Sequence, residues 1–247
     1  MKIKALIVFT LCLLGLGLQA ETISFKASDG LSVTADIYII HDKSAPLILL
    51  FHQAGWSRGE YQEIAPRLNS LGFNCMAIDQ RSGKTVNGVE NLTNRAAKSE
   101  MKSTAYLDAL PDILGAIEYA EKFLSEGKII LWGSSYSSSL VLKIAGDSPE
   151  RVEAVLAFSP GEYFGSAGKP TDFIQQSAQR ITIPVFVTSS KAEKKNWWAI
   201  YEAIPAGNKT FFLPEFQGNH GSRALWSKYT DHQEYWKAVE AFLESIK

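Results

Sequence analysis

The chain has 247 residues, 46% of them hydrophobic, and its 25 basic and 26 acidic side chains give a formal net charge of −1. So balanced a charge argues against nucleic acid as a partner. The length and apolar content fit one large domain with a sizeable core rather than two small ones.

The first twenty residues have the organisation of a secretory signal peptide. Lys2 and Lys4 form a short basic start, residues 5–18 are almost wholly apolar, and Ala20 precedes the polar Glu21. This pattern predicts cleavage after Ala20, a secreted or periplasmic location and a mature domain over residues 21–247. The alternative is an uncleaved anchor, although the apolar run is short for a hydrocarbon layer of about 30 Å, and we expect no stable membrane insertion.

Cleavage would leave 23 basic and 26 acidic side chains, a net charge of −3, and a single cysteine, Cys75. No intramolecular disulfide can then form, even in an oxidising compartment. The apolar surroundings of Cys75 indicate an inert thiol in a buried strand.

The predicted elements begin with an antiparallel hairpin and continue as alternating strands and helices. The hairpin pairs residues 22–26 with 31–40 across the turn signal Ser28-Asp-Gly30. The later strands are expected at 46–51, 73–78, 128–132, 152–158, 181–188 and 209–213. The helices are expected at 60–71, 104–124, 136–145, 194–204 and 232–246. This order predicts an α/β fold, with a mostly parallel central sheet of about eight strands covered by helices on both faces.

Two connections are longer and more polar than the rest. The stretch from Arg81 to Met101 exceeds an ordinary loop, and both a lid over the site and a surface excursion remain open. The segment that follows residue 158 is expected to stay loose up to Arg180.

The sequence Trp132-Gly-Ser-Ser-Tyr-Ser137 joins a buried strand directly to a helical pattern. A serine on such a sharp strand-to-helix turn needs small neighbours, and Gly133 and Ser137 supply them. The turn would expose the hydroxyl of Ser135 above the sheet and aim the backbone N–H of Tyr136 at a developing oxyanion. We predict that Ser135 is a nucleophile.

A second oxyanion donor is expected after the strand at residues 46–51. There Phe51-His-Gln-Ala-Gly55 places the backbone N–H of Ala54, or less favourably that of Gln53, opposite Tyr136. We interpret His52 as a structural residue that holds this turn.

Two histidines follow Ser135 in the chain. His220 lies in the loop Phe216-Gln-Gly-Asn-His-Gly-Ser222, just beyond the last predicted strand, and His232 lies in or beside the closing helix. A loop at that edge of the sheet can bring an imidazole to the serine, so we predict His220 as the general base.

Taken together, these motifs and Ala77-Ile-Asp-Gln-Arg-Ser-Gly83 resemble the α/β-hydrolase superfamily, in particular its small, secreted dienelactone-hydrolase-like members. The resemblance covers essentially the whole mature chain. It implies hydrolysis of an ester, thioester or related acyl compound without a cofactor, and we predict no metal site. Dienelactone-hydrolase-type members often carry a cysteine nucleophile, where this chain presents Ser135.

The acid that would orient His220 is harder to assign. The superfamily usually places an aspartate where this chain has Ala192, in Ser189-Ser-Lys-Ala-Glu193. Glu193 is one position further on and is our first choice, because its longer side chain extends its reach. Glu162, which follows the preceding strand, is the rival.

The leading hypothesis is a serine hydrolase that acts on a small-molecule acyl substrate through Ser135, His220 and Glu193. The alternatives are a non-catalytic binding protein of the same fold and an exopeptidase-like amide hydrolase that uses the same residues. Several aromatic side chains fit either a pocket or ordinary packing: Trp56, Tyr61, Tyr136, Tyr163, Phe164, Trp197 and Trp198.

Overall fold

The structure is a computed structural model that describes residues 20–205, 207 and 209–247. The predicted signal peptide therefore lies, except for Ala20, outside the described residues. In the part of the chain that is described, no helix combines the length and the apolar character needed to cross a membrane.

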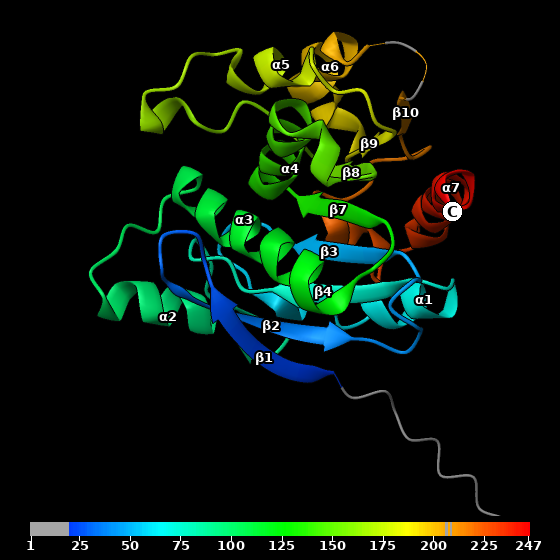
Figure 1. Cartoon of the computed structure of the whole chain (residues 1–247). Helices are drawn as coiled ribbons and strands as arrows, with labels where there is room; N and C mark the ends of the chain where they lie inside the picture. The colour runs from blue at the N-terminus through cyan, green and yellow to red at the C-terminus, as the bar shows by residue number, and fades with distance from the viewer. Residues whose placement is uncertain (1–19, 206, 208) are drawn as a thin grey trace, which may run out of the picture.

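The centre of the molecule is an eight-stranded sheet in the order β1-β2-β4-β3-β7-β8-β9-β10 (Figure 1). Its strands are β1 (Glu21–Lys26), β2 (Ser32–Tyr38), β3 (Leu47–Phe51), β4 (Asn74–Ile78), β7 (Ile129–Ser134), β8 (Ala154–Phe158), β9 (Val185–Thr188) and β10 (Lys209–Phe212). β2 pairs antiparallel with β1 and β4, and the pairs from β4 to β10 are all parallel. The predicted mostly parallel sheet with an N-terminal antiparallel hairpin is confirmed.

The central strands are apolar because both of their faces are covered. Every residue of β3 is buried, and its side chains alternate between two hydrophobic clusters, with Leu47 and Leu49 in one and Ile48 and Leu50 in the other. A strand between two helical layers has no solvent-facing side, so the sequence shows a continuous apolar run instead of an alternating one.

Helices cover both faces. The cluster that contains Ile48 is completed by α1 (Ile64–Ser70) and α7 (His232–Ile246). The cluster that contains Leu47 is completed by α2 (Leu92–Ser99), α3 (Leu110–Tyr119), α4 (Tyr136–Asp147), α5 (Phe173–Ala178) and α6 (Lys194–Ala203). Short helical turns complete the chain: η1 (Arg58–Tyr61), η2 (Leu107–Ala109), η3 (Ala120–Leu124), η4 (Pro149–Arg151), η5 (Gly165–Ala167), η6 (Lys191–Glu193) and η7 (Ser222–Leu225).

Prolines explain where predicted elements are shortened. The helix expected at 60–71 is split into η1 and α1, and Pro66 lies in the first turn of α1, where its missing N–H has no helical partner to lose. The strand expected from residue 181 begins only after Pro184. The helix expected at 104–124 becomes η2, α3 and one π-helical turn, with Pro111 at the start of α3.

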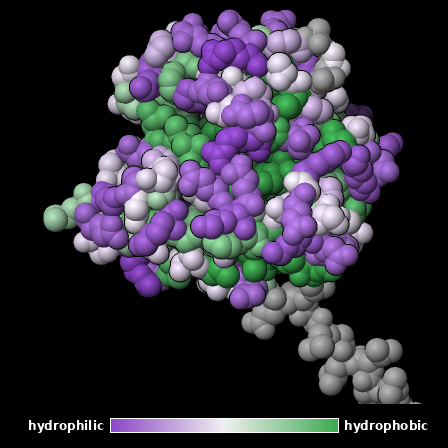
Figure 2. All heavy atoms as spheres, viewed as in Figure 1, coloured by the Kyte–Doolittle hydropathy of each residue, from purple (hydrophilic) through white to green (hydrophobic). Residues whose placement is uncertain are grey.

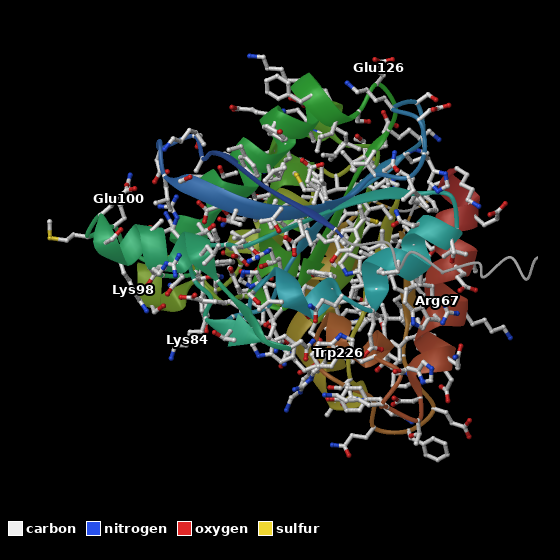
Figure 3. The ribbon with its side chains drawn as sticks, turned by 90° about the horizontal axis from the view of Figure 1, so that it is seen from below. Arg67, Lys84, Lys98, Glu100, Glu126 and Trp226 are labelled. Atoms are coloured by element: carbon white, nitrogen blue, oxygen red, sulfur yellow. The ribbon has the colours of Figure 1, made fainter. Side chains whose placement is uncertain are left out.

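The segment from Arg81 to Met101 is a packed excursion. It forms a small hairpin of β5 (Thr85–Val86) and β6 (Val89–Glu90), followed by α2, whose N-cap Asn91 accepts a hydrogen bond from the Asn94 N–H. The Thr93 hydroxyl accepts a hydrogen bond of 2.9 Å from the Thr34 N–H of β2. Lys84, Lys98 and Glu100 are exposed along this segment (Figure 3). The hydrogen bond to Thr34 anchors this segment to β2, and the lid and the surface excursion both stay predictions.

Candidate active site

The carboxyl ends of the parallel strands form one edge of the molecule, on the left in Figure 1. The space-filling view is notched on the same side, and apolar residues line the upper wall of the notch (Figure 2). The loops that follow β3, β7, β8, β9 and β10 begin at this edge, because these strands are parallel. In open parallel sheets ligands bind at this edge.

Ser135 lies on a strained turn between β7 and α4. Its backbone has φ 59° and ψ −127°, a region that costs a non-glycine residue about 1–3 kcal/mol. A Cβ on Gly133 would lie 2.4 Å from the Ser138 Cα, so the turn admits only glycine there. The Ser135 N–H donates to the Phe158 carbonyl over 2.7 Å, which ties the turn to β8. These features match the predicted nucleophile elbow.

Glu193 and His220 lie together after β9 and β10. His220 Nδ1 lies 2.5 Å from Glu193 Oε1. Burial alone would raise the pKa of Glu193, but hydrogen bonds, first of all the one from His220, hold its pKa below the ordinary value. Because the ionised carboxylate only accepts hydrogen bonds, Nδ1 carries the proton and Nε2 is left as a base. The first-choice acid and the predicted base are therefore joined.

Ser159 connects these two residues to β8 and was missed by the sequence reasoning. Its hydroxyl donates to Glu193 Oε2 over 2.8 Å and accepts from the Gly221 N–H over 2.9 Å. Its backbone has φ 56°, which turns the chain sharply at the end of the strand. The sequence Ser159-Pro-Gly161 signals a turn but gives no indication of these bonds.

The rival acid has a different role. Both oxygens of Glu162 accept from the Ile174 N–H at 2.9–3.0 Å, and Oε1 also accepts from the Gln175 N–H. These are first-turn donors of α5, which would otherwise lack partners. Glu162 thus satisfies the start of a helix that the sequence analysis had taken for a loose segment.

His220 is brought to the elbow through its neighbours. The Ser222 N–H donates to Ser134 Oγ over 2.9 Å, and Ser134 immediately precedes the candidate nucleophile. A Cβ on Gly221 would lie 2.5 Å from the same oxygen, so the backbone of the His220 loop packs directly on the elbow. Within the described residues no hydrogen bond joins Ser135 Oγ to His220. Such bonds are often long before substrate binds.

The turn after β3 is held by two buried side chains. His52 donates from Nδ1 to the Gln53 carbonyl and accepts at Nε2 from the Gln80 N–H, both over 2.8 Å, and burial lowers its pKa to about 4. It is structural, as the sequence indicated. The Gln53 N–H donates to Glu60 Oε2 over 2.8 Å. That donor is therefore occupied, which favours Ala54 over Gln53 as the oxyanion donor.

Three tyrosines gather at the elbow. The Tyr106 ring stacks on Tyr136 with centroids 4.7 Å apart, and Tyr106 is 40% exposed. The Tyr163 hydroxyl donates to the Ser159 carbonyl over 2.8 Å. Burial raises the pKa of Tyr163 to about 12. Tyr163 is thus a neutral hydroxyl beside the candidate nucleophile.

Of the remaining aromatic residues, several belong to the interior. The fully buried ones are Tyr61, Phe164 and Trp197. The Trp56 ring stacks on Trp226 with ring centroids 5.2 Å apart. Trp198 stacks on Tyr201 beside the edge strand β10. Packing accounts for these side chains.

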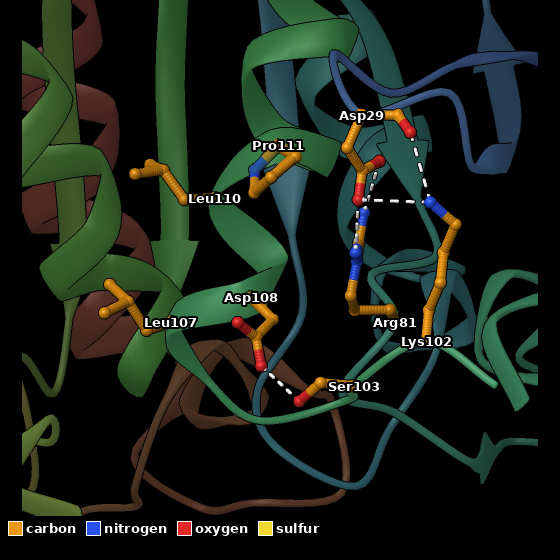
Figure 4. Close-up of a pocket in the computed structure, with 8 residues that line it drawn as sticks. All are labelled: Asp29, Arg81, Lys102, Ser103, Leu107, Asp108, Leu110 and Pro111. Atoms are coloured by element: carbon orange, nitrogen blue, oxygen red, sulfur yellow. Dashed lines mark hydrogen bonds and ion pairs between the residues drawn. The ribbon is translucent and has the colours of Figure 1, made fainter. Parts of the chain in front are cut away.

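A separate hollow of about 360 Å³ lies beside the start of α3 (Figure 4). Arg81 enters it from β4's loop, but its guanidinium bonds Asp29 at 2.7 Å and Asp112 at 2.7 Å. Lys102 donates to the Asp29 carbonyl over 3.1 Å. The two cationic side chains that line this hollow, Arg81 and Lys102, thus already have partners. Neither Ser135 nor His220 lines the hollow.

Comparison with solved structures identifies the fold. An esterase from Pyrococcus furiosus superposes with a TM-score of 0.70 at 17% sequence identity, covering 93% of each chain. A dienelactone hydrolase from Anabaena variabilis also gives 0.70, at 14% identity over 92% of this chain and 98% of the other. The chain has the α/β-hydrolase fold. No protein-family model matches the sequence, and neither does any curated protein.

An acylaminoacyl peptidase from Pyrococcus horikoshii shares this α/β-hydrolase fold, with a TM-score of 0.67 at 15% identity. It matches over 92% of this chain but only 41% of its own. The resemblance to dienelactone-hydrolase-like members that the motifs predicted is confirmed for the fold. All these identities are low, so the chemistry must be argued from the site itself.

Proposed function

We propose that the protein is a serine hydrolase that cleaves carboxylic esters or related acyl compounds through Ser135, His220 and Glu193. The observation that carries the proposal is the 2.5 Å contact of His220 Nδ1 with Glu193 Oε1, on a loop bonded to the residue before Ser135. A base oriented by an acid beside a strained serine is the arrangement that acyl transfer requires.

In the proposed reaction, Ser135 Oγ attacks the acyl carbon while His220 Nε2 accepts its proton. The oxyanion receives hydrogen bonds from two backbone N–H groups, that of Ala54 after β3 and that of Tyr136 at the start of α4. His220 then protonates the leaving alcohol, and a water molecule repeats the cycle on the acyl-enzyme. Glu193 holds the imidazole in the required tautomer and stabilises its cation.

The Glu193 contact also bears on the non-catalytic alternative. That alternative was motivated by Ala192, which stands where an aspartate was expected. Glutamate is longer by one methylene, and from the next position its carboxylate bonds His220. The reason for expecting an inactive site is thereby weakened.

The amide-hydrolase alternative uses the same residues and draws support from the peptidase named above. Sequence and fold do not separate it from ester hydrolysis, because acyl specificity depends on the shape of the pocket. Parallel assays on p-nitrophenyl acetate and on an acetylated amino-acid p-nitroanilide distinguish the two by relative kcat/KM.

The test is hydrolysis of p-nitrophenyl acetate by the mature protein and by Ser135→Ala and His220→Ala. We expect both variants to lose at least about 10³-fold in kcat. His232→Ala is the control, because His232 lies at the start of α7 and bonds the Tyr229 carbonyl. Equal activity of wild type and Ser135→Ala would refute the proposal.

We further propose that residues 1–20 direct export and are removed. Expression in a bacterium with a periplasm, followed by N-terminal sequencing, is expected to give a mature chain that begins at Glu21 and is recovered from the periplasm or medium. Retention of Met1 in the cytoplasm would contradict this part of the proposal.

A further inference from the structure

A buried carboxylate lies beneath the candidate active site. Glu60, in η1, is completely inaccessible to solvent. Among the described residues Glu60 forms no ion pair. The positive charge of Arg223 lowers the pKa of Glu60 without a direct contact. Burial of an ionisable group is costly unless hydrogen bonds compensate it, so its partners indicate why it is present.

The two oxygens of Glu60 have partners in two segments of the site. Oε2 accepts from the Gln53 N–H over 2.8 Å, and Oε1 accepts from the Ser134 hydroxyl over 2.7 Å. Gln53 precedes the candidate oxyanion donor Ala54, and Ser134 precedes Ser135. The Glu60 carboxylate therefore bonds the residue that precedes the candidate oxyanion donor and the residue that precedes the candidate nucleophile.

The network continues into the loop of the general base. Ser134 Oγ, which donates to Glu60, accepts from the Ser222 N–H over 2.9 Å. The backbone carbonyl of Glu60 accepts a hydrogen bond of 2.9 Å from Trp226 Nε1. Trp226 lies just after the loop that carries His220. The segments after β3, β7 and β10 are thus linked through the side chain and backbone of one residue.

We propose that Glu60 is a positioning residue that sets the Ala54 N–H and the His220 loop relative to Ser135, through the Gln53 N–H and the Ser134 hydroxyl. The proposal rests on the hydrolase function proposed above. It explains why the carboxylate is retained in the interior, where an apolar side chain would pack without a desolvation cost.

Both contacts of the Glu60 side chain are best satisfied by the two oxygens of a carboxylate. Both partners, a backbone N–H and a hydroxyl that is already an acceptor for Ser222, donate to Glu60. An ionised carboxylate accepts with both oxygens, whereas the amide of a glutamine has one accepting oxygen and one NH₂ group. In Glu60→Gln the shape is kept, but the amide oxygen accepts only one of the two hydrogen bonds. If it accepts from the Gln53 N–H, the NH₂ group donates to Ser134 Oγ and the Ser134 hydroxyl proton loses its acceptor.

The kinetic test compares Glu60→Gln with wild type on p-nitrophenyl acetate. Displacement of catalytic groups by about 1 Å costs on the order of 10²-fold, so we expect kcat to fall by about 10- to 100-fold with KM changed less than about threefold. Glu63→Gln is the matched control. Glu63 is exposed on the same segment and accepts from the Ser227 N–H over 2.9 Å. Its variant is expected to retain wild-type kcat.

A Glu60→Gln kcat within twofold of wild type would overturn the proposal, as would an equal loss in Glu63→Gln. If Glu60→Gln does not fold, Ser134→Ala decides, because it removes the link while Glu60 remains. We expect a loss in kcat of about 3- to 30-fold there, at nearly unchanged KM. A Ser134→Ala protein with wild-type kcat overturns the proposal.

A readout without turnover separates this proposal from the hydrolase function. Burial raises the pKa of Glu60 to about 7, opposed by Ser134, Gln53, Arg223 and Ser222, and Tyr61 also faces it. The amide proton resonance of Gln53 should therefore shift as pH passes through about 7 in wild type and not in Glu60→Gln. A Gln53 amide resonance that is the same in wild type and Glu60→Gln at every pH overturns the positioning role, because the Gln53 N–H would then not sense Glu60. Absence of Ser135-dependent hydrolysis in wild type, with the Gln53 difference present, counts against the hydrolase alone.

Discussion

Replacing Glu193 by glutamine is the sharpest perturbation of the proposed triad. The variant keeps the size of the side chain and removes the negative charge that faces His220 Nδ1 at 2.5 Å. Glutamine can also present its NH₂ group to the ring, which favours the wrong tautomer. We expect kcat on p-nitrophenyl acetate to fall with little change in KM, because the imidazolium forms only in the transition state.

The magnitude follows from the contact. Opposite charges about 4 Å apart interact by about 4 kcal/mol at an effective dielectric constant of about 20, which corresponds to roughly 10³-fold in rate. The Glu193 side chain is 23% exposed, so solvent weakens this interaction. The expected loss in kcat is therefore about 30- to 1,000-fold.

Glu162→Gln is the control for this experiment, because Glu162 was the rival acid in the sequence and bonds the start of α5 instead. We expect its kcat to stay within about twofold of wild type, with a loss in stability of about 1 kcal/mol from the weakened first turn. Kinetics of both variants, with circular dichroism as a check of folding, give the answer. The reasoning is refuted if Glu193→Gln keeps more than a third of the wild-type kcat, or if Glu162→Gln loses as much.

Three further outcomes follow from the structure. Ser159→Ala removes the hydroxyl that bonds both the acid and the His220 loop, so kcat should fall by about 10-fold at similar KM; unchanged kinetics would contradict this role. Gly133→Ala should fail to fold or melt far below wild type, since its Cβ would lie 2.4 Å from the Ser138 Cα, whereas Gly165→Ala, with open space around its Cβ, should melt near wild type. Burial raises the pKa of Glu60 from 4.5 to about 7, so the folded state binds the extra proton in this range and wild type should lose stability relative to Glu60→Gln between pH 5 and pH 8. Urea unfolding of both proteins at the two pH values measures this, and an equal difference at both would contradict it.

Much of the fold could be predicted from the sequence because the central strands are apolar throughout. β3, β4 and β8 are each buried along their whole length, and such runs between helical patterns are typical of a parallel sheet. The shortest helix, α5, was missed. Its start is satisfied by the distant Glu162, and a contact between residues twelve positions apart leaves no periodic signal in the chain.

The site was predictable where local geometry dictates the residue type. The elbow needs a glycine at residue 133 because a Cβ there would collide with the backbone of Ser138, only five residues later. A constraint between residues so close in the sequence leaves a motif that can be recognised from the chain alone. Glu193 remained one of two choices, since its contact with His220 joins residues that lie 27 positions apart. Glu60 and Ser159 were not found, because their roles depend on hydrogen bonds between strand ends that only the folded sheet brings together.

The central claim is that Ser135 is an activated nucleophile, and covalent labelling tests it most directly. Incubation of the folded wild-type protein with a fluorophosphonate probe, followed by peptide mass spectrometry, should place one label per chain on Ser135. The label should be absent in Ser135→Ala and form much more slowly in His220→Ala. A folded wild-type protein that stays unlabelled, or carries the label on another residue, would contradict the account.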